Sequence, residues 1–205
     1  MSLARERGGS DAFIPFVEQA MVDSPGISAY PAARALLVAE AGRLEEARPL
    51  LAAALAGHAH MPIDGLWVMS LALLGQAVVI LEDTELAPVL YTQILPWSGY
   101  LLAQAGASFH LGAADRVLGS LASVAGRPDD ADRHLAAALD LEQRIEARPC
   151  IVRTRIAIAR AHARRGGPAD PALAALLAAA AADAADLGMT EHLAQIRALQ
   201  VAPAG

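Results

Sequence analysis

The fold of this 205-residue chain is constrained most by a pattern of small and large residues that recurs about every 40 residues. Each copy has a turn residue, a small residue at +5, a large apolar residue at +9 and a small or apolar residue at +12. The two clearest copies are Gly42 with Ala47, Leu51 and Ala54, and Gly126 with Ala131, Leu135 and Ala138. Two weaker copies are Glu82 with Ala87, Tyr91 and Ile94, and Gly167 with Ala172, Leu176 and Ala179.

This pattern predicts helical hairpins that stack on one another. Glycine tolerates the positive φ of a tight turn between helices, and acidic residues such as Glu45 and Asp129 suit the start of the helix that follows. Small residues let neighbouring helices approach closely, and a Leu-Gly pair ending at Gly75 or Gly119 precedes two of the copies. Because a hairpin buries its apolar face only against its neighbours, we expect an array of hairpins.

The composition favours an all-α chain. Ala and Leu, which lose little entropy in a helix, occupy 49 and 29 positions. We expect an α-solenoid of about four hairpins at 11–200, with a flexible N-terminus or expression-tag remnant at 1–10 and a frayed tail at 201–205. The predicted helices are 11–22, 29–41, 43–57, 62–81, 84–96, 101–125, 128–146, 148–165, 169–187 and 190–200.

The charge and cysteine content exclude several classes of function. All 16 cationic residues are Arg, so the chain has no lysine for a P-loop, a Schiff base or a general base. The net charge of −6 argues against general binding of nucleic acid. The most apolar run, 66–81, is too short to cross a bilayer, and residues 1–10 lack the pattern of a secretory signal. With Cys150 as the one cysteine, we expect a reducing compartment, the cytoplasm.

The repeat resembles a known helical motif. The turn residue, Ala at +5, aromatic or Leu at +9, Ala at +12 and Leu-Gly at −8 and −7 resemble the tetratricopeptide (TPR) pattern, with a longer period. The segments 39–48, 139–149 and 153–160 are similar to the C-terminal helical repeat region of large bacterial transcriptional regulators. Those regulators carry an ATPase module of the AAA or STAND type, in some cases with a cyclase-like or LuxR-type DNA-binding domain.

The resemblance covers about residues 11–200 and rests on packing motifs. It implies a TPR-like sensor or scaffold arm that binds a partner or an inducer and carries no catalytic residue. Since a P-loop needs a lysine, this chain cannot hold the ATPase site of such a regulator. We therefore expect either a fragment of a regulator or a stand-alone relative.

An arginine-rich segment at 148–165 is the strongest electrostatic feature. It contains six of the 16 arginines and no acidic residue. On a helix, Arg153, Arg160 and Arg164 share one face, and Arg155 belongs to a second stripe. One stripe could meet an acidic peptide or a phosphate-bearing ligand in the concave groove. The alternative is ion pairing with the preceding helix, which carries Asp129, Asp130, Asp132, Asp140, Glu142 and Glu146.

Most large rings of the chain lie between positions 67 and 109. They are Trp67, Tyr91, Trp97, Tyr100 and Phe109. Rings at this density could line a binding groove, for which we single out Trp67, Trp97 and Tyr100. The alternative is core packing between two hairpins, with at least one ring exposed at the turn after Pro96.

The histidines and the cysteine do not form a recognisable reactive set. His58 and His60 with Asp64 could offer metal ligands, but we expect solvated loop residues there and no metal or cofactor. His110 and His134 are predicted to lie on a polar face or to be hydrogen-bonded inside the protein. No Ser/His/Asp set is apparent, and Cys150 is expected to be a small buried residue.

These patterns predict a non-catalytic module, without membrane or direct nucleic-acid contact, that binds a protein or peptide partner in a concave groove, with an acidic partner as one candidate. A second hypothesis is a protein that encloses a small anionic ligand between the aromatic segment and the arginine helix. A third is self-association into a homodimer through the alanine-rich surface at 171–200.

Overall fold

The computed structural model describes residues 10–27, 29–61, 63, 65–103, 110–166 and 170–201. The all-α prediction is confirmed, since most of these residues lie in helices. The α-helices are α2 (Ser10–Asp23), α3 (Ala29–Glu40), α4 (Leu44–His58), α5 (Gly65–Leu81), α6 (Leu86–Ile94), α7 (Ala114–Val124), α8 (Pro128–Arg144), α9 (Arg148–Arg164), α10 (Pro171–Asp186) and α11 (Thr190–Val201). A short 3₁₀ helix, η1 (Leu95–Trp97), follows α6, and two strands, β1 (Leu101–Ala103) and β2 (His110–Ala113), precede α7.

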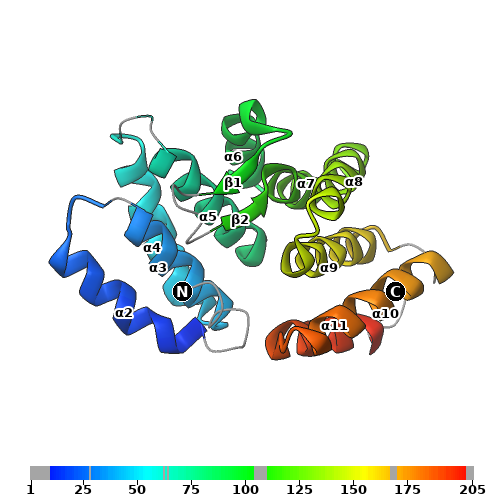
Figure 1. Ribbon diagram of the computed structural model, residues 1–205. Helices are drawn as coiled ribbons and strands as arrows, with labels where there is room; N and C mark the ends of the chain where they lie inside the picture. Colours follow the sequence, from blue (N-terminus) through cyan, green and yellow to red (C-terminus); the bar gives the residue numbers. More distant parts are fainter. Residues whose placement is uncertain are drawn as a thin grey trace.

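The helices form a curved row (Figure 1). Helices that follow one another along the chain pack together, and so do α3 with α5, α5 with α7, α7 with α9 and α9 with α11. The two ends of the row, α2 and α11, both lie at the bottom of the view in Figure 1. The odd-numbered helices α3 to α11 are therefore joined by a second set of contacts in addition to those between chain neighbours.

Three of the four predicted repeat copies lie as expected. The residues at +5, +9 and +12 are buried in the copies that begin at Gly42, Glu82 and Gly126. The turn residues of these copies also share one conformation, with φ of 77° at Gly42, 51° at Glu82 and 70° at Gly126. Glu82 thus adopts the left-handed conformation that favours glycine, so the copy that begins at Glu82 makes the same turn without a glycine.

The Leu-Gly pairs mark places where helices are in close contact. A methyl group added at Gly75 would lie 2.9 Å from Val117 Cγ1 of α7. A methyl group at Gly119 would lie 2.6 Å from Leu135 Cγ and 3.0 Å from the backbone oxygen of Ala131, both in α8. Real carbon atoms do not approach this closely, so each glycine is required by the packing of the helix beside it.

The fourth predicted copy has the wrong register. Ala172 and Ala179 are exposed and Leu176 is only half-buried, whereas Leu177 and Ala180 are buried. The apolar face therefore lies one residue further along than predicted. Helix α10 begins at Pro171 with Asp170 as its N-cap, two residues after the expected start. The anchor Gly167 and the turn residues 168–169 lie outside the described residues.

The predicted helix at 101–125 is also wrong in its first half. Strands β1 and β2 pair antiparallel in this region, and α7 begins only at Ala114. Gly112 has a φ of 90°, which a helix does not allow. The buried side chain of Glu142 accepts a hydrogen bond from the backbone N–H of Ala113 at 3.0 Å and another from Thr154 Oγ1 at 2.7 Å. A carboxylate from α8 thus supports the backbone of β2, an interaction between distant residues that the local sequence does not reveal.

The apolar interior has two parts. One cluster of buried side chains extends from Ile14 in α2 to Ala131 in α8. The other is smaller and joins α9, α10 and α11 through residues such as Ile156, Leu177 and Ile196. None of the helices in the described part of the chain is both long and apolar enough to cross a membrane.

Replacing Gly119 by alanine tests the close approach of α7 and α8. We expect Gly119→Ala to lower the free energy of unfolding by about 2 kcal/mol, because Leu135 and the α8 backbone must move. The matched control is Gly57→Ala in α4, where an added methyl group meets no atom within 4 Å. The control is expected to raise the stability by about 0.5 kcal/mol through helix propensity alone. Urea denaturation of both variants measures the difference, and equal effects would contradict the packing role of Gly119.

Candidate functional site

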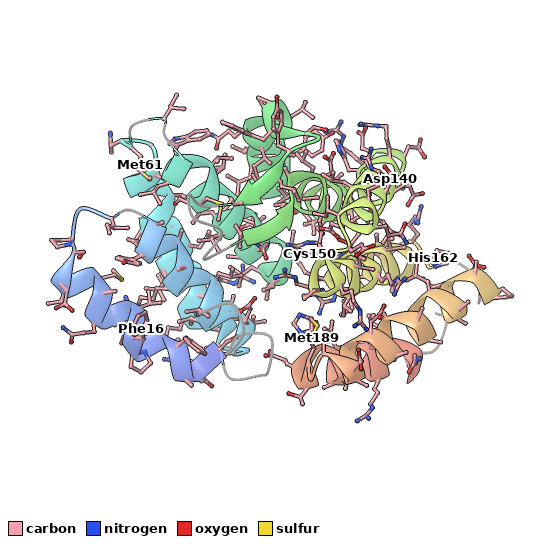
Figure 2. The ribbon with its side chains drawn as sticks, in the orientation of Figure 1. Phe16, Met61, Asp140, Cys150, His162 and Met189 are labelled. Atoms are coloured by element: carbon pink, nitrogen blue, oxygen red, sulfur yellow. The ribbon has the colours of Figure 1, made fainter. Side chains whose placement is uncertain are left out.

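The inner side of the helix row contains a cleft of about 200 Å³. Its described lining comes from α3, α5, α7, α9 and α11, together with Ser10 at the start of α2. In Figure 2 the label Cys150 marks the start of α9, and Met189 marks the residue just before α11. Side chains from both ends of the row, Ser10 of α2 and Gln195 of α11, therefore face the same space.

The predicted arginine stripe lies in this cleft. Arg153, Arg160 and Arg164 all line it, as the helical spacing of the sequence indicated. Arg155, the fourth predicted binding residue, does not line the cleft. It forms an ion pair with Asp183 of α10 at 2.7 Å, on another side of α9.

The arginines of α9 pair mainly with helices other than the one expected. Arg148 contacts Asp183 and Asp186 of α10 at 3.0 and 2.8 Å, and Arg164 contacts Glu82 at 3.2 Å. Within the described residues, the preceding helix α8 contributes one ion pair, between Asp132 and Arg165. Three other α8 acids have different partners, since Asp130 and Asp140 pair with arginines close to them in sequence and Glu142 accepts a hydrogen bond from β2. The predicted pairing with α8 is thus wrong for all but Arg165.

Arg160 is a cationic residue of the cleft whose side-chain partner is neutral. Its guanidinium donates a hydrogen bond to the neutral Gln195 Oε1 at 3.1 Å, and no carboxylate of the described residues lies within ion-pair distance. Burial, followed by repulsion from Arg164, lowers the pKa of Arg160, while Glu40 and Glu82 act in the opposite direction at longer range. A partly desolvated cation with one neutral partner favours a bound anion.

The cleft as a whole carries positive charge in an acidic protein. Four arginines line it, including Arg116 of α7, against two glutamates, Glu40 and Glu191. The lining therefore has a formal charge of +2, although the chain has a net charge of −6. Arg116, His192 and Gln195 were not identified from the sequence, because they lie on α7 and α11, far from α9 in the chain, and share no local motif with its arginines.

The aromatic residues do not join the arginines in this site. None of Trp67, Trp97 and Tyr100 is among the described lining residues. Trp67 packs against His58 with 4.9 Å between ring centroids and the two rings tilted by 40°, and Trp97 packs edge-on against Tyr100 at 6.5 Å. Tyr100 is 63% exposed, as expected of one ring at this turn, and Phe109 lies outside the described residues.

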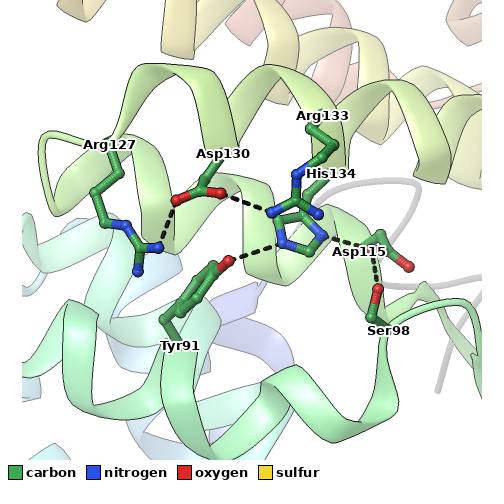
Figure 3. A network of polar contacts seen from close by, with 7 residues as sticks. All are labelled: Tyr91, Ser98, Asp115, Arg127, Asp130, Arg133 and His134. Atoms are coloured by element: carbon green, nitrogen blue, oxygen red, sulfur yellow. Dashed lines mark hydrogen bonds and ion pairs between the residues drawn. The ribbon is translucent and has the colours of Figure 1, made fainter.

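A buried polar network connects α6, α7 and α8 (Figure 3). His134 Nδ1 lies 2.6 Å from Asp115 Oδ1, and His134 Nε2 lies 2.9 Å from the Tyr91 hydroxyl. Asp115 also accepts hydrogen bonds from Ser98 Oγ and from the backbone N–H of Gly99. A neutral imidazole with its proton on Nδ1 satisfies both neighbours.

The network is a packing feature, since Tyr91, Asp115 and His134 are each at most 3% exposed and leave no room for a substrate. Burial raises the pKa of Asp115, but hydrogen bonds from His134, Gly99 and Ser98 together outweigh it and hold the pKa below its ordinary value of 3.8. The prediction that His134 is hydrogen-bonded inside the protein is confirmed.

The other histidines and the cysteine are not part of the network of Tyr91, Asp115 and His134. His58 is buried and contacts the backbone oxygen of Trp67 at 3.0 Å, so the predicted solvated loop is wrong for this residue, whereas His60 is exposed. Asp64 lies outside the described residues, and so does the side chain of His110. Cys150 is buried, as predicted. In the described part of the chain, no three His, Cys, Asp or Glu side chains are placed to hold a metal ion.

The pH dependence of stability tests the Asp115 network. Because the folded-state pKa of Asp115 is lowered, its ionised form stabilises the fold above about pH 4, and this contribution is lost as the pH falls through the folded-state pKa. We expect Asp115→Asn to cost about 2–3 kcal/mol at pH 7 and progressively less below about pH 4. Asp140→Asn, in an exposed pair with Arg144, is the control and should change stability by less than about 0.5 kcal/mol. A cost of Asp115→Asn that is constant from pH 7 to pH 3 would contradict this role.

Comparison with known proteins does not place the chain in a family. No model of a known protein family, no curated protein sequence and no solved structure matches it. The resemblance to TPR-like repeats therefore rests on the residues of this chain alone.

Proposed function

We propose that the chain is a non-catalytic interaction module that binds an acidic group of a protein or peptide partner on the inner side of the helix row. The observation that carries this proposal is the position of Arg153, Arg160 and Arg164 in one cleft, with Arg160 hydrogen-bonded to a neutral side chain. Arginine suits such a role because its planar fork of donors matches a carboxylate or a phosphate.

The order of helix packing supports a solenoid of hairpins as the framework of this module. Successive helices pack on each other, and the described lining of the cleft comes from the alternate helices α3 to α11, with Ser10 of α2 as the one addition. In solenoids of helical hairpins, the first helix of each unit forms the concave binding surface. The resemblance to the repeat arm of bacterial transcriptional regulators fits such a role and is part of the proposal.

A small anionic ligand is the second candidate, and the size of the cleft favours it. A volume of about 200 Å³ is below the roughly 300–1,000 Å³ typical of sites for drug-sized ligands. The cleft can thus take one acidic group, from either a side chain of a partner or a small molecule. The aromatic segment is no part of this second candidate, because its rings lie elsewhere.

Reversing the charge of Arg160 tests the proposal. We expect Arg160→Glu, alone or with Arg153→Glu, to reduce the affinity for fluorescent peptides rich in Asp and Glu at least about tenfold, measured by anisotropy. The melting temperature should change little, because Arg160 has no ion pair to lose in the described structure and is repelled by Arg164. Arg144→Glu, on the outer surface of α8, is the control and should leave the affinity unchanged.

Two outcomes would count against the acidic-partner function. Equal loss of affinity in Arg144→Glu would mean that only the net charge matters. A fall of many degrees in the melting temperature of the milder variant Arg160→Gln would assign Arg160 to the packing of the fold.

A further inference from the structure

The cleft lies at the seam between the two apolar clusters of the protein. Val117, which lines the cleft, belongs to the cluster of α2 to α8, and Ile156, which also lines it, belongs to the cluster of α9 to α11. Helix α9 is tied to the first part through the hydrogen bond from Thr154 to Glu142. Helices α10 and α11 pack on α9 and on each other.

Helix α11 approaches the arginines through polar side chains. His192 and Gln195 line the cleft from α11, and Gln195 accepts the hydrogen bond from Arg160. On the opposite side, Ser10 donates a hydrogen bond to Glu40 at 3.0 Å, and both residues line the cleft. A group bound beside Arg160 would therefore contact residues from both parts of the protein.

If the chain binds its partner in this cleft, as proposed above, charge and size define the group that enters. The formal charge of +2 of the lining is matched by two negative charges. The small volume requires that these charges belong to one compact group. A long polyanion would also meet the net negative charge of the remaining surface.

We propose that a compact dianion, the chemistry shared by phosphate and by a short dicarboxylate, binds between Arg153, Arg160 and the His192–Gln195 edge of α11. The arginine forks donate to its oxygens, and the imidazole and the amide of α11 offer further N–H donors. Because α9 and α11 then contact the same group, binding stabilises the packing of the α10–α11 hairpin on the rest of the protein. The bound state is more closed and more rigid at its C-terminal end than the free state.

Titration of the intact chain with inorganic phosphate and with succinate tests this inference. Isothermal calorimetry at constant ionic strength, with sodium chloride as the reference salt, measures the affinity for each dianion. We expect saturable 1:1 binding that weakens at least about tenfold in Arg160→Gln and about threefold in Gln195→Ala. Arg144→Gln, which removes a charge on the outer surface, should bind like the unchanged chain. Circular dichroism confirms that each variant is folded.

Hydrogen exchange tests the closing of the C-terminal hairpin. If opening of α10 and α11 destroys the site, their amide exchange slows by up to about 100-fold at a ligand concentration of 100 times Kd. Amides of α4, which contributes none of the described lining, should exchange at the same rate with and without the dianion. Gln195→Ala should lose most of the protection while it still binds.

Three results would overturn the inference: no binding of either dianion up to about 10 mM, equal binding by Arg160→Gln, or binding without protection of α10 and α11. If acidic peptides bind in an Arg160-dependent way but free dianions do not, the proposed function stands and the compact-dianion site is wrong. If dianions bind and protect α11 but acidic peptides do not compete with them, the inference stands and the partner is a small molecule.

Discussion

The close contact of neighbouring helices at Gly75 and Gly119 is the constraint on which the rest of the structure depends. A single methyl group would overlap atoms of α7 at Gly75 and of α8 at Gly119, and at Gly75 it would also press on Ile94 of α6, so these residues set the spacing between α5, α6, α7 and α8. The buried alanines of the repeat allow similarly close packing along the row. With this spacing, helices two positions apart also touch, and their inner faces come together around one cleft.

Much of this framework could be predicted from the sequence, because it depends on residues close together in the chain. The offsets from each turn residue identify the buried face of three hairpins, and the helical period of α9 places Arg153, Arg160 and Arg164 on one face. The same reasoning fails where a distant residue decides the conformation. The hairpin of β1 and β2 depends on the φ of Gly112 and on a carboxylate from α8, neither of which alters the local pattern of apolar residues.

The arginines of the site could be predicted from the sequence, but the residues that surround them could not. The sequence indicates which side chains share a face of α9, but the acids that neutralise four of its arginines come from α8, α10 and the turn before α6. What distinguishes Arg160 from Arg155 is thus the neighbour it meets after folding, Gln195 in one case and Asp183 in the other. Among the six arginines, Arg155 therefore ties α9 to α10, Arg160 faces the cleft, and Arg164 does both, since it lines the cleft and pairs with Glu82.

Because the apolar interior is divided into two clusters, a ligand in this cleft can affect the stability of the C-terminal helices. Helix α10 is rich in alanine, and the cluster that α10 and α11 share with α9 contains few large side chains, so this end has less apolar burial to stabilise it than the rest of the row. The ion pairs of Asp183 with Arg148 and Arg155 are partly solvent-exposed, and such pairs add little stability. A ligand that contacts both α9 and α11 adds an interaction at the end of the row that has less apolar burial. A modest binding energy at that point changes the order of the C-terminal hairpin more than the same energy would elsewhere in the row.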